Sequence, residues 1–221
     1  MSLVHLVREP AAEPEGALIL NHGRGSDERD LYGLLDELDP ERRLIGVSTG
    51  APLTGIPPGG RHWYVVERVG SPDARTFDHG YRALTGFLEE FLDGRGVAWE
   101  RTIVGGFSMG AVMSYAVALG EGRPSPAAVI ALSGFVPTVD TWRADLSARG
   151  RLPVFIHHGR LDPVIGVEFG RRARDLLERA ALEVAYLETE AGHWLPPEIL
   201  PRLRDFVAES LARQGARSPG S

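Results

Sequence analysis

The sequence predicts an α/β fold, with a mostly parallel central sheet and helices on both of its faces. Continuous apolar runs, typical of strands buried on both faces, alternate along the chain with segments whose apolar residues recur at helical spacing. Polar clusters directly follow several of these runs, at the sheet edge where ligands bind in such folds. The chain has 221 residues and neither an internal repeat nor a dividing linker, so we expect one domain over residues 1–221, with 214–221 as a flexible tail.

The amino-terminal part of the chain supplies the first strands and helix. Residues 3–7 predict a short edge strand, and the apolar run 17–20 predicts a strand buried on both faces. Leucines at helical spacing over 31–38 predict an amphipathic helix, and 44–47 predict the next strand. The stretch 51–73 is rich in proline and glycine, so we expect a long irregular loop, which in a compact domain is usually functional or disordered.

The rest of the chain continues the alternation. Apolar and aromatic residues at helical spacing predict helices over 77–91, 169–180 and 199–207, and continuous apolar runs predict strands at 128–132, 154–156 and 184–187. A long connection that contains Trp142 separates two of these strands, over residues 133–152. Right-handed crossovers between such strands place the helices on both faces of the sheet.

The segment 102–113 is central to the interpretation, because it reads as a buried strand, a sharp glycine-lined turn and a helix. Ser108 lies at the tip of the turn, and Gly106 and Gly110 leave the space that larger side chains would fill. This pattern is the nucleophile elbow of an α/β-hydrolase, in which the following helix directs its amides at a developing oxyanion. It predicts the α/β-hydrolase fold, with Ser108 as the nucleophile.

A second match to G-x-S-x-G, at residues 46–50, shows that the motif alone is not decisive. Ser48 also follows a strand-like run, but Ala51-Pro52 and a proline- and glycine-rich stretch come next, so no helix can begin there. Ser108, by contrast, is followed by apolar residues at helical spacing. We therefore favour Ser108 over Ser48.

A serine nucleophile needs a base, and the base needs an acceptor that fixes its tautomer. In α/β-hydrolases the acid and then the histidine follow the serine, and here Asp162 follows one expected strand and His193 the next. A turn-forming Asp-Pro and a surface-loop histidine are the alternatives for these two residues. His157 and His158 end a strand, so their side chains point to opposite faces. Other candidates either precede Ser108 or do not directly follow a strand: His5, His62, His79, Asp140 and Asp145.

Two backbone amides are the expected donors to the oxyanion. One belongs to Met109, directly after the nucleophile, and the other to Arg24, in the loop after the strand at 17–20. Gly23 and Gly25 flank Arg24 and allow the backbone to turn inward. The same segment can also be a tight strand-to-helix turn with Asp27 as N-cap. The Arg24 side chain is either solvated or able to recognise an anionic group.

The tryptophans and a sparse set of polar residues leave two further interpretations open. Trp63, in the 51–73 loop, is expected to line the substrate pocket, with ordinary packing as the alternative, and the same choice applies to Trp142 and Trp194. A metal site built from His22, Asp27 and His158 has no supporting ligand spacing, so we expect no metal.

Composition excludes several other classes of chemistry. The chain has no cysteine, which removes a thiol nucleophile, disulfides and Cys-based metal sites. It has no lysine either, which removes a Ser–Lys dyad and a Schiff base. The net charge of -6 argues against a nucleic-acid surface. No apolar run reaches the about 18 residues of a membrane span, and the amino terminus lacks a signal-peptide pattern, so we expect a cytoplasmic protein.

Four motifs resemble those of the phospholipase/carboxylesterase family of small α/β-hydrolases, which includes acyl-protein thioesterases and lysophospholipases. They are N-H-G-R-G-S-D, G-G-F-S-M-G-A, H-G-R-L-D-P-V and A-G-H-W, and they occur in the order typical of the family. The resemblance extends from the strand at 17–20 to the carboxyl-terminal helix. It implies an enzyme with no cofactor or metal and a minimal lid. Dienelactone hydrolases share the fold but typically use cysteine, which Ser108 argues against.

The resemblance implies the same site residues as the motifs do. Ser108 is the nucleophile, His193 the general base and Asp162 its orienting acid, while Arg24 and Met109 supply the oxyanion amides. The family often has glutamine where this chain has Met109, but only the backbone amide is required.

We expect a serine carboxylesterase that hydrolyses short- to medium-chain carboxylic esters through an acyl-enzyme intermediate. A lysophospholipase or acyl thioesterase with the same triad is the enzymatic alternative, and an inactive hydrolase-fold binding protein is the non-enzymatic one. The expected partner is a small-molecule ester. A homodimer stays open, because an exposed apolar mouth can serve a dimer interface as well as a lipid tail.

Overall fold

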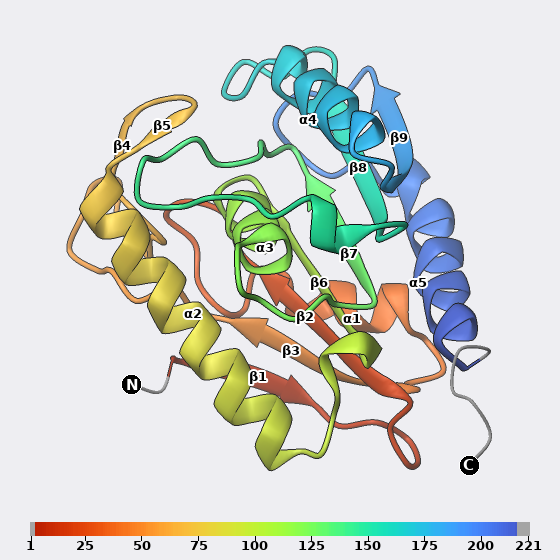
Figure 1. Ribbon diagram of the computed structural model, residues 1–221. Helices are drawn as coiled ribbons and strands as arrows, with labels where there is room; N and C mark the ends of the chain where they lie inside the picture. The colour runs from red at the N-terminus through yellow and green to blue at the C-terminus, as the bar shows by residue number, and fades with distance from the viewer. Residues whose placement is uncertain (1–2, 216–221) are drawn as a thin grey trace.

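The computed structural model describes residues 3–215 and contains a seven-stranded sheet with helices on both faces (Figure 1). The strand order is β1-β3-β2-β6-β7-β8-β9; β1 is antiparallel to β3, and every other pairing in this sheet is parallel. The strands are β1 (His5–Arg8), β2 (Gly16–Asn21), β3 (Leu44–Thr49), β6 (Thr102–Phe107), β7 (Ala128–Leu132), β8 (Pro153–Gly159) and β9 (Glu183–Thr189). The predicted α/β-hydrolase fold is confirmed.

Two helical layers cover the sheet. The helices are α1 (Tyr32–Leu38), α2 (Ala74–Gly94), α3 (Met109–Leu119), α4 (Val167–Arg179) and α5 (Leu200–Gly215), with short 3-10 turns η1 (Trp99–Arg101), η2 (Ser147–Arg149) and η3 (Pro197–Ile199). Helices α2, α3 and α4 pack on one face of the sheet, and α1 and α5 pack on the other (Figure 1). Residues 214 and 215 of the expected tail belong to α5, and the remainder of that tail lies outside the described residues.

The alternation of side chains along the strands builds these two layers. On β2, Ile19 packs toward α2 and α3, while Leu18 and Leu20 pack toward α1 and α5. Every residue of α3 is buried, since this helix is enclosed between the sheet and its neighbouring helices. Its predominantly apolar sequence therefore reflects burial on all sides.

The parallel strands end at the same edge of the sheet. Register pairs Asn21 with Gly106, Phe107 with Leu132 and Leu132 with His157. The loops that follow β2, β6, β8 and β9 consequently leave one edge together. This edge holds the polar clusters singled out in the sequence.

Two local expectations differ from the structure. The 51–73 stretch is not wholly irregular, because it contains the antiparallel pair β4 (Val66–Arg68) and β5 (Ser71–Pro72). Asp27 does not cap α1, because that helix begins only at Tyr32; its carboxylate instead accepts a 2.8 Å hydrogen bond from the amide of Arg29. The short turns between Asp27 and Tyr32 delay the start of the helix.

Candidate active site

Ser108 occupies the strained tip of the turn between β6 and α3. Its backbone has φ 54° and ψ -118°, a conformation that a residue with a side chain adopts only when its surroundings impose it. A Cβ on Gly110 would lie 1.9 Å from the carbonyl oxygen of Asn21, and one on Gly106 would lie 2.6 Å from the same atom. The glycines therefore allow the elbow to pack directly against the end of β2.

A hydrogen-bonded chain links Ser108 to His193 and Asp162. His193 Nε2 lies 2.8 Å from Ser108 Oγ, and His193 Nδ1 lies 2.6 Å from Asp162 Oδ2. A carboxylate oxygen accepts, so Nδ1 carries the imidazole proton and Nε2 is free to accept the serine proton. The three residues come from loops after β6, β8 and β9, as the sequence predicts.

The Asp162 carboxylate is fully buried and held by its own loop. Its Oδ1 accepts hydrogen bonds of 2.8 and 2.9 Å from the amides of Val164 and Ile165, which leaves Oδ2 for His193. This arrangement satisfies the buried charge and fixes the direction in which it meets the imidazole.

The loops that carry Asp162 and His193 run in direct contact. A Cβ on Gly159, the last residue of β8, would lie 2.2 Å from the carbonyl oxygen of Ala191, so only glycine allows this approach. The amide of Leu161 donates a 3.1 Å hydrogen bond to the same carbonyl. The ring of His193 also packs against the ring of Phe107, with 4.9 Å between the ring centroids.

Two unpaired amides lie beside Ser108. Met109 is the first residue of α3, so its N–H has no intrahelical acceptor, and Arg24 follows Gly23 in the loop after β2. Within residues 3–215, neither N–H donates to a protein group. A Cβ built on Gly23 would lie only 3.5 Å from Cβ of Ser108, which places the Gly23–Arg24 segment against the serine.

A cavity of about 360 Å³ opens over Ser108, and residues of several loops line it. Its apolar wall includes Tyr64, Val66 and Val69 from the segment around β4, together with Phe135 and Ile165. The volume lies at the lower end of the range for small-molecule sites. Sequence reasoning did not identify these wall residues, since they carry no motif.

Trp63 does not line this cavity, contrary to expectation. Its side chain is fully buried, and its indole N–H donates a 3.0 Å hydrogen bond to the carbonyl oxygen of His22. The neighbouring Tyr64 lines the cavity in its place. Trp142 is half-buried against α3, to whose Ala116 carbonyl its N–H donates, and Trp194 is 53% exposed.

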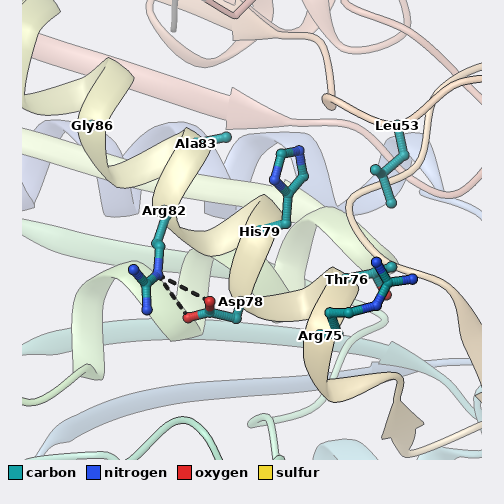
Figure 2. A pocket seen from close by; sticks show the side chains of 8 residues that line it. All are labelled: Leu53, Arg75, Thr76, Asp78, His79, Arg82, Ala83 and Gly86. Carbon is teal, nitrogen blue, oxygen red and sulfur yellow. Dashed lines mark hydrogen bonds and ion pairs between the residues drawn. The ribbon is translucent and has the colours of Figure 1, made fainter.

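A larger hollow of about 690 Å³ lies away from the triad, between the outer face of α2 and the loop at Leu53 (Figure 2). Arg75, His79 and Arg82 from α2 line it, and Arg82 pairs with Asp78 one helical turn earlier. Among the described residues around this hollow, no serine or threonine is hydrogen-bonded to a histidine. The hollow therefore contains no counterpart of the hydrogen-bonded Ser108–His193–Asp162 chain.

Two further features concern residues 3–215: side chains that could bind a metal ion, and helices that could span a membrane. No group of three His, Cys, Asp or Glu side chains in this range is placed to hold a metal ion, and His22, Asp27 and His158 are not gathered into such a group. No helix in the same range has the length and apolar character that a bilayer span requires.

The fold, the elbow and the Ser–His–Asp chain together define the class of α/β-hydrolase serine hydrolases. Within that class, the chain belongs to the phospholipase/carboxylesterase family, whose family model matches residues 4–211. The resemblance seen in the sequence motifs is thereby confirmed, and the protein is a hydrolase of this family.

Individual relatives cover almost the whole chain. Acyl-protein thioesterase 1 of Debaryomyces hansenii is 28% identical over 96% of this chain and 99% of that protein. The structure of a Bacillus cereus carboxylesterase matches with a TM-score of 0.82 at 19% identity, over 94% of both chains, which shows the shared fold. The structure of esterase PE8 matches with a TM-score of 0.78 at 25% identity, over 95% of this chain and 99% of that one.

Proposed function

We propose that this protein is a serine carboxylesterase that hydrolyses short- to medium-chain carboxylic esters. The observation that carries the proposal is the continuous hydrogen-bonded chain from Asp162 through His193 to Ser108, beside a partly apolar cavity of about 360 Å³. A cavity of this size suits a small acyl group better than a long one.

In the proposed reaction, Ser108 Oγ attacks the ester carbonyl carbon while its proton passes to His193 Nε2. The carbonyl oxygen becomes an oxyanion that accepts hydrogen bonds from the amides of Arg24 and Met109. Collapse of this intermediate breaks the bond to the alcohol, which takes the proton from His193. Water then attacks the acyl-enzyme and gives a proton to His193. The bond from the acyl carbon to Ser108 Oγ breaks, Ser108 takes this proton from His193, and the carboxylic acid leaves. Asp162 stabilises the imidazolium in both halves of the cycle.

The second candidate function is hydrolysis of acyl thioesters or lysophospholipids by the same residues. The acyl-protein thioesterase relative, whose similarity covers nearly the full chain, favours thioesters, and the phospholipase/carboxylesterase family favours lysophospholipids. Thioester and ester carbonyls undergo the same acyl transfer, so the triad does not discriminate between them. Discrimination depends on the cavity and on the leaving group.

The test is a series of p-nitrophenyl esters of increasing acyl length, compared with thioesters of the same acyl groups, with Ser108→Ala as control. The proposal predicts the highest kcat/KM for short or medium esters and a loss of activity in Ser108→Ala. A preference for long acyl chains or thioesters would support the second candidate function. Equal turnover by the parent protein and Ser108→Ala would rule out Ser108 as nucleophile.

A fluorophosphonate probe separates these enzymes from an inactive binding protein. The parent protein should form an adduct on Ser108, and Ser108→Ala should form none. Absence of an adduct on the folded parent protein would favour the binding protein.

A further inference from the structure

His22 is a fully buried histidine next to the proposed site, and the proposed reaction does not use it. It directly follows β2 and precedes Gly23, at the carboxyl edge of the sheet. Its ring makes two hydrogen bonds: Nδ1 lies 2.6 Å from the carbonyl oxygen of Gly23, and Nε2 lies 3.0 Å from the amide nitrogen of Ala51. A buried imidazole with both nitrogens engaged has one defined orientation.

The partners of the ring determine its tautomer. The amide of Ala51 can only donate, so Nε2 of His22 must be the acceptor. The proton consequently resides on Nδ1, which donates to the Gly23 carbonyl. Burial lowers the pKa of His22, against the opposing effects of the Gly23 hydrogen bond and of the nearby carboxylates of Asp27, Glu28 and Asp30.

The carbonyl that His22 holds belongs to the same peptide unit as the N–H of Arg24. In a planar trans peptide the C=O and N–H point in opposite directions, so fixing the Gly23 oxygen also fixes the direction of the Arg24 N–H. That N–H has no protein acceptor within residues 3–215, and Gly23 packs against Ser108. The only other donor to the Gly23 oxygen in this range is the amide of Ser26, at 3.4 Å.

A second contact secures the preceding peptide. The indole N–H of Trp63 donates to the carbonyl oxygen of His22 at 3.0 Å. The backbone of His22 and Gly23 is thus held at two successive carbonyls, each by a buried aromatic ring. Such a backbone needs no rearrangement when charge develops on a substrate oxygen nearby.

We propose that His22 is a positioning residue for the oxyanion hole, because it orients the Gly23–Arg24 peptide so that the Arg24 N–H faces the developing oxyanion. The inference rests on the proposed function of this same site. His22 touches neither the substrate nor the reacting atoms and acts only through this peptide. Loss of a single oxyanion donor typically reduces kcat about 10²- to 10³-fold, and a misaligned donor loses part of that effect.

The test compares His22→Leu, which removes both ring nitrogens, with His22→Asn, whose side-chain amide can still donate to the Gly23 oxygen. His157→Leu is the matched control, since His157 is also a fully buried histidine but bonds to Thr189 and not to the loop after β2. Active sites are counted by fluorophosphonate titration, so that kcat refers to competent protein. Affinity for a trifluoromethyl ketone, whose serine adduct carries an oxyanion, reports on the oxyanion hole directly.

We expect His22→Leu to lower kcat about 10- to 100-fold with little change in KM, and to weaken ketone inhibition in parallel. His22→Asn should recover part of both effects, and His157→Leu should change neither. If His22→Leu does not fold, His22→Phe, which keeps a ring without its nitrogens, replaces it. Unchanged kcat and ketone affinity, a change in KM alone, or equal losses in the His157 control would overturn the inference.

The outcome for Ser108→Ala separates this inference from the proposed function. If Ser108→Ala keeps full activity, the proposed function fails and the inference fails with it. If Ser108→Ala is inactive while His22→Leu keeps full kcat, the inference alone fails.

Discussion

His193 Nδ1 lies 2.6 Å from one oxygen of Asp162, while the other oxygen accepts hydrogen bonds from two backbone amides. Replacing Asp162 by Asn keeps the shape but offers an N–H where the carboxylate oxygen accepted a hydrogen bond from His193 Nδ1–H, so the imidazole adopts the wrong tautomer. We expect Asp162→Asn to reduce kcat about 10⁴-fold while the protein stays folded. Steady-state kinetics on a p-nitrophenyl ester measures this loss.

Asp140→Asn is the control for this prediction. Asp140 is exposed and is a rival candidate for the acid on sequence grounds, so its amide variant should keep the parent kcat. A loss of similar size in both variants, or none in Asp162→Asn, would contradict the assigned role of Asp162.

The parts of the site that lie on short motifs could be predicted from the sequence, because local spacing determines them. Gly106, Ser108 and Gly110 specify a sharp turn by themselves. The carboxyl ends of parallel strands lie at the same edge of the sheet, whatever the lengths of the connecting loops. This logic places Ser108, Asp162 and His193 at one edge, and the structure brings them within hydrogen-bond distance.

The wall of the cavity could not be predicted in the same way. Trp63 and Tyr64 are adjacent, and which of them enters the cavity depends on how the irregular chain packs against α3 and the His22 carbonyl. Phe135 and Ile165 follow different strands and carry no local signal. Long-range packing determines their positions, and the spacing of residues along the sequence does not reveal such packing.

Two glycines in helices should respond oppositely to alanine. A Cβ on Gly110 would lie 1.9 Å from the Asn21 carbonyl oxygen, whereas a Cβ on Gly86, on the exposed face of α2, meets nothing within 4 Å. Gly86→Ala should therefore stabilise the protein by about 0.5–1 kcal/mol, because alanine loses less entropy in a helix. Gly110→Ala should lower the free energy of unfolding and the activity. Urea unfolding of both variants checks this, and a stable, active Gly110→Ala would contradict the close contact between the elbow and β2.

The edge strand β1 is fixed by an ion pair that the sequence did not reveal, between residues far apart in the chain. Arg8 Nη2 lies 2.6 Å from Asp39 Oδ2, both side chains are buried, and Arg8 also donates to the carbonyl oxygens of Leu35 and Leu44. Arg8→Met would leave the Asp39 charge buried without its cation, so we expect a loss of about 3–5 kcal/mol in the free energy of unfolding. Arg82→Met breaks an exposed pair with Asp78 and should change stability by less than about 0.5 kcal/mol. Equal effects of the two substitutions in urea unfolding would argue against a buried Arg8–Asp39 pair.

Buried histidines should make the fold sensitive to mild acid. Burial, together with the neighbouring His158, lowers the pKa of His157 to about 4 from the ordinary value of 6.5. Between these two pH values the unfolded chain binds a proton at this position that the folded chain does not. The contribution of neutral His157 to the free energy of unfolding is therefore complete above pH 6.5, and it is lost progressively as the pH falls toward 4.

Urea unfolding at pH 7, 6, 5 and 4.5 tests this prediction. The free energy of unfolding should decrease across this series in the parent protein. His157→Leu, which has no group to protonate there, should show a shallower decrease, although burial also lowers the pKa values of His22 and His158, which remain in the variant. The ion pair with Arg171 lowers the pKa of Glu188 to about 2 from 4.5, so Glu188 adds to the decrease only near and below pH 4.5, and it does so equally in both proteins. Identical pH dependence in the parent and His157→Leu would show that His157 does not contribute.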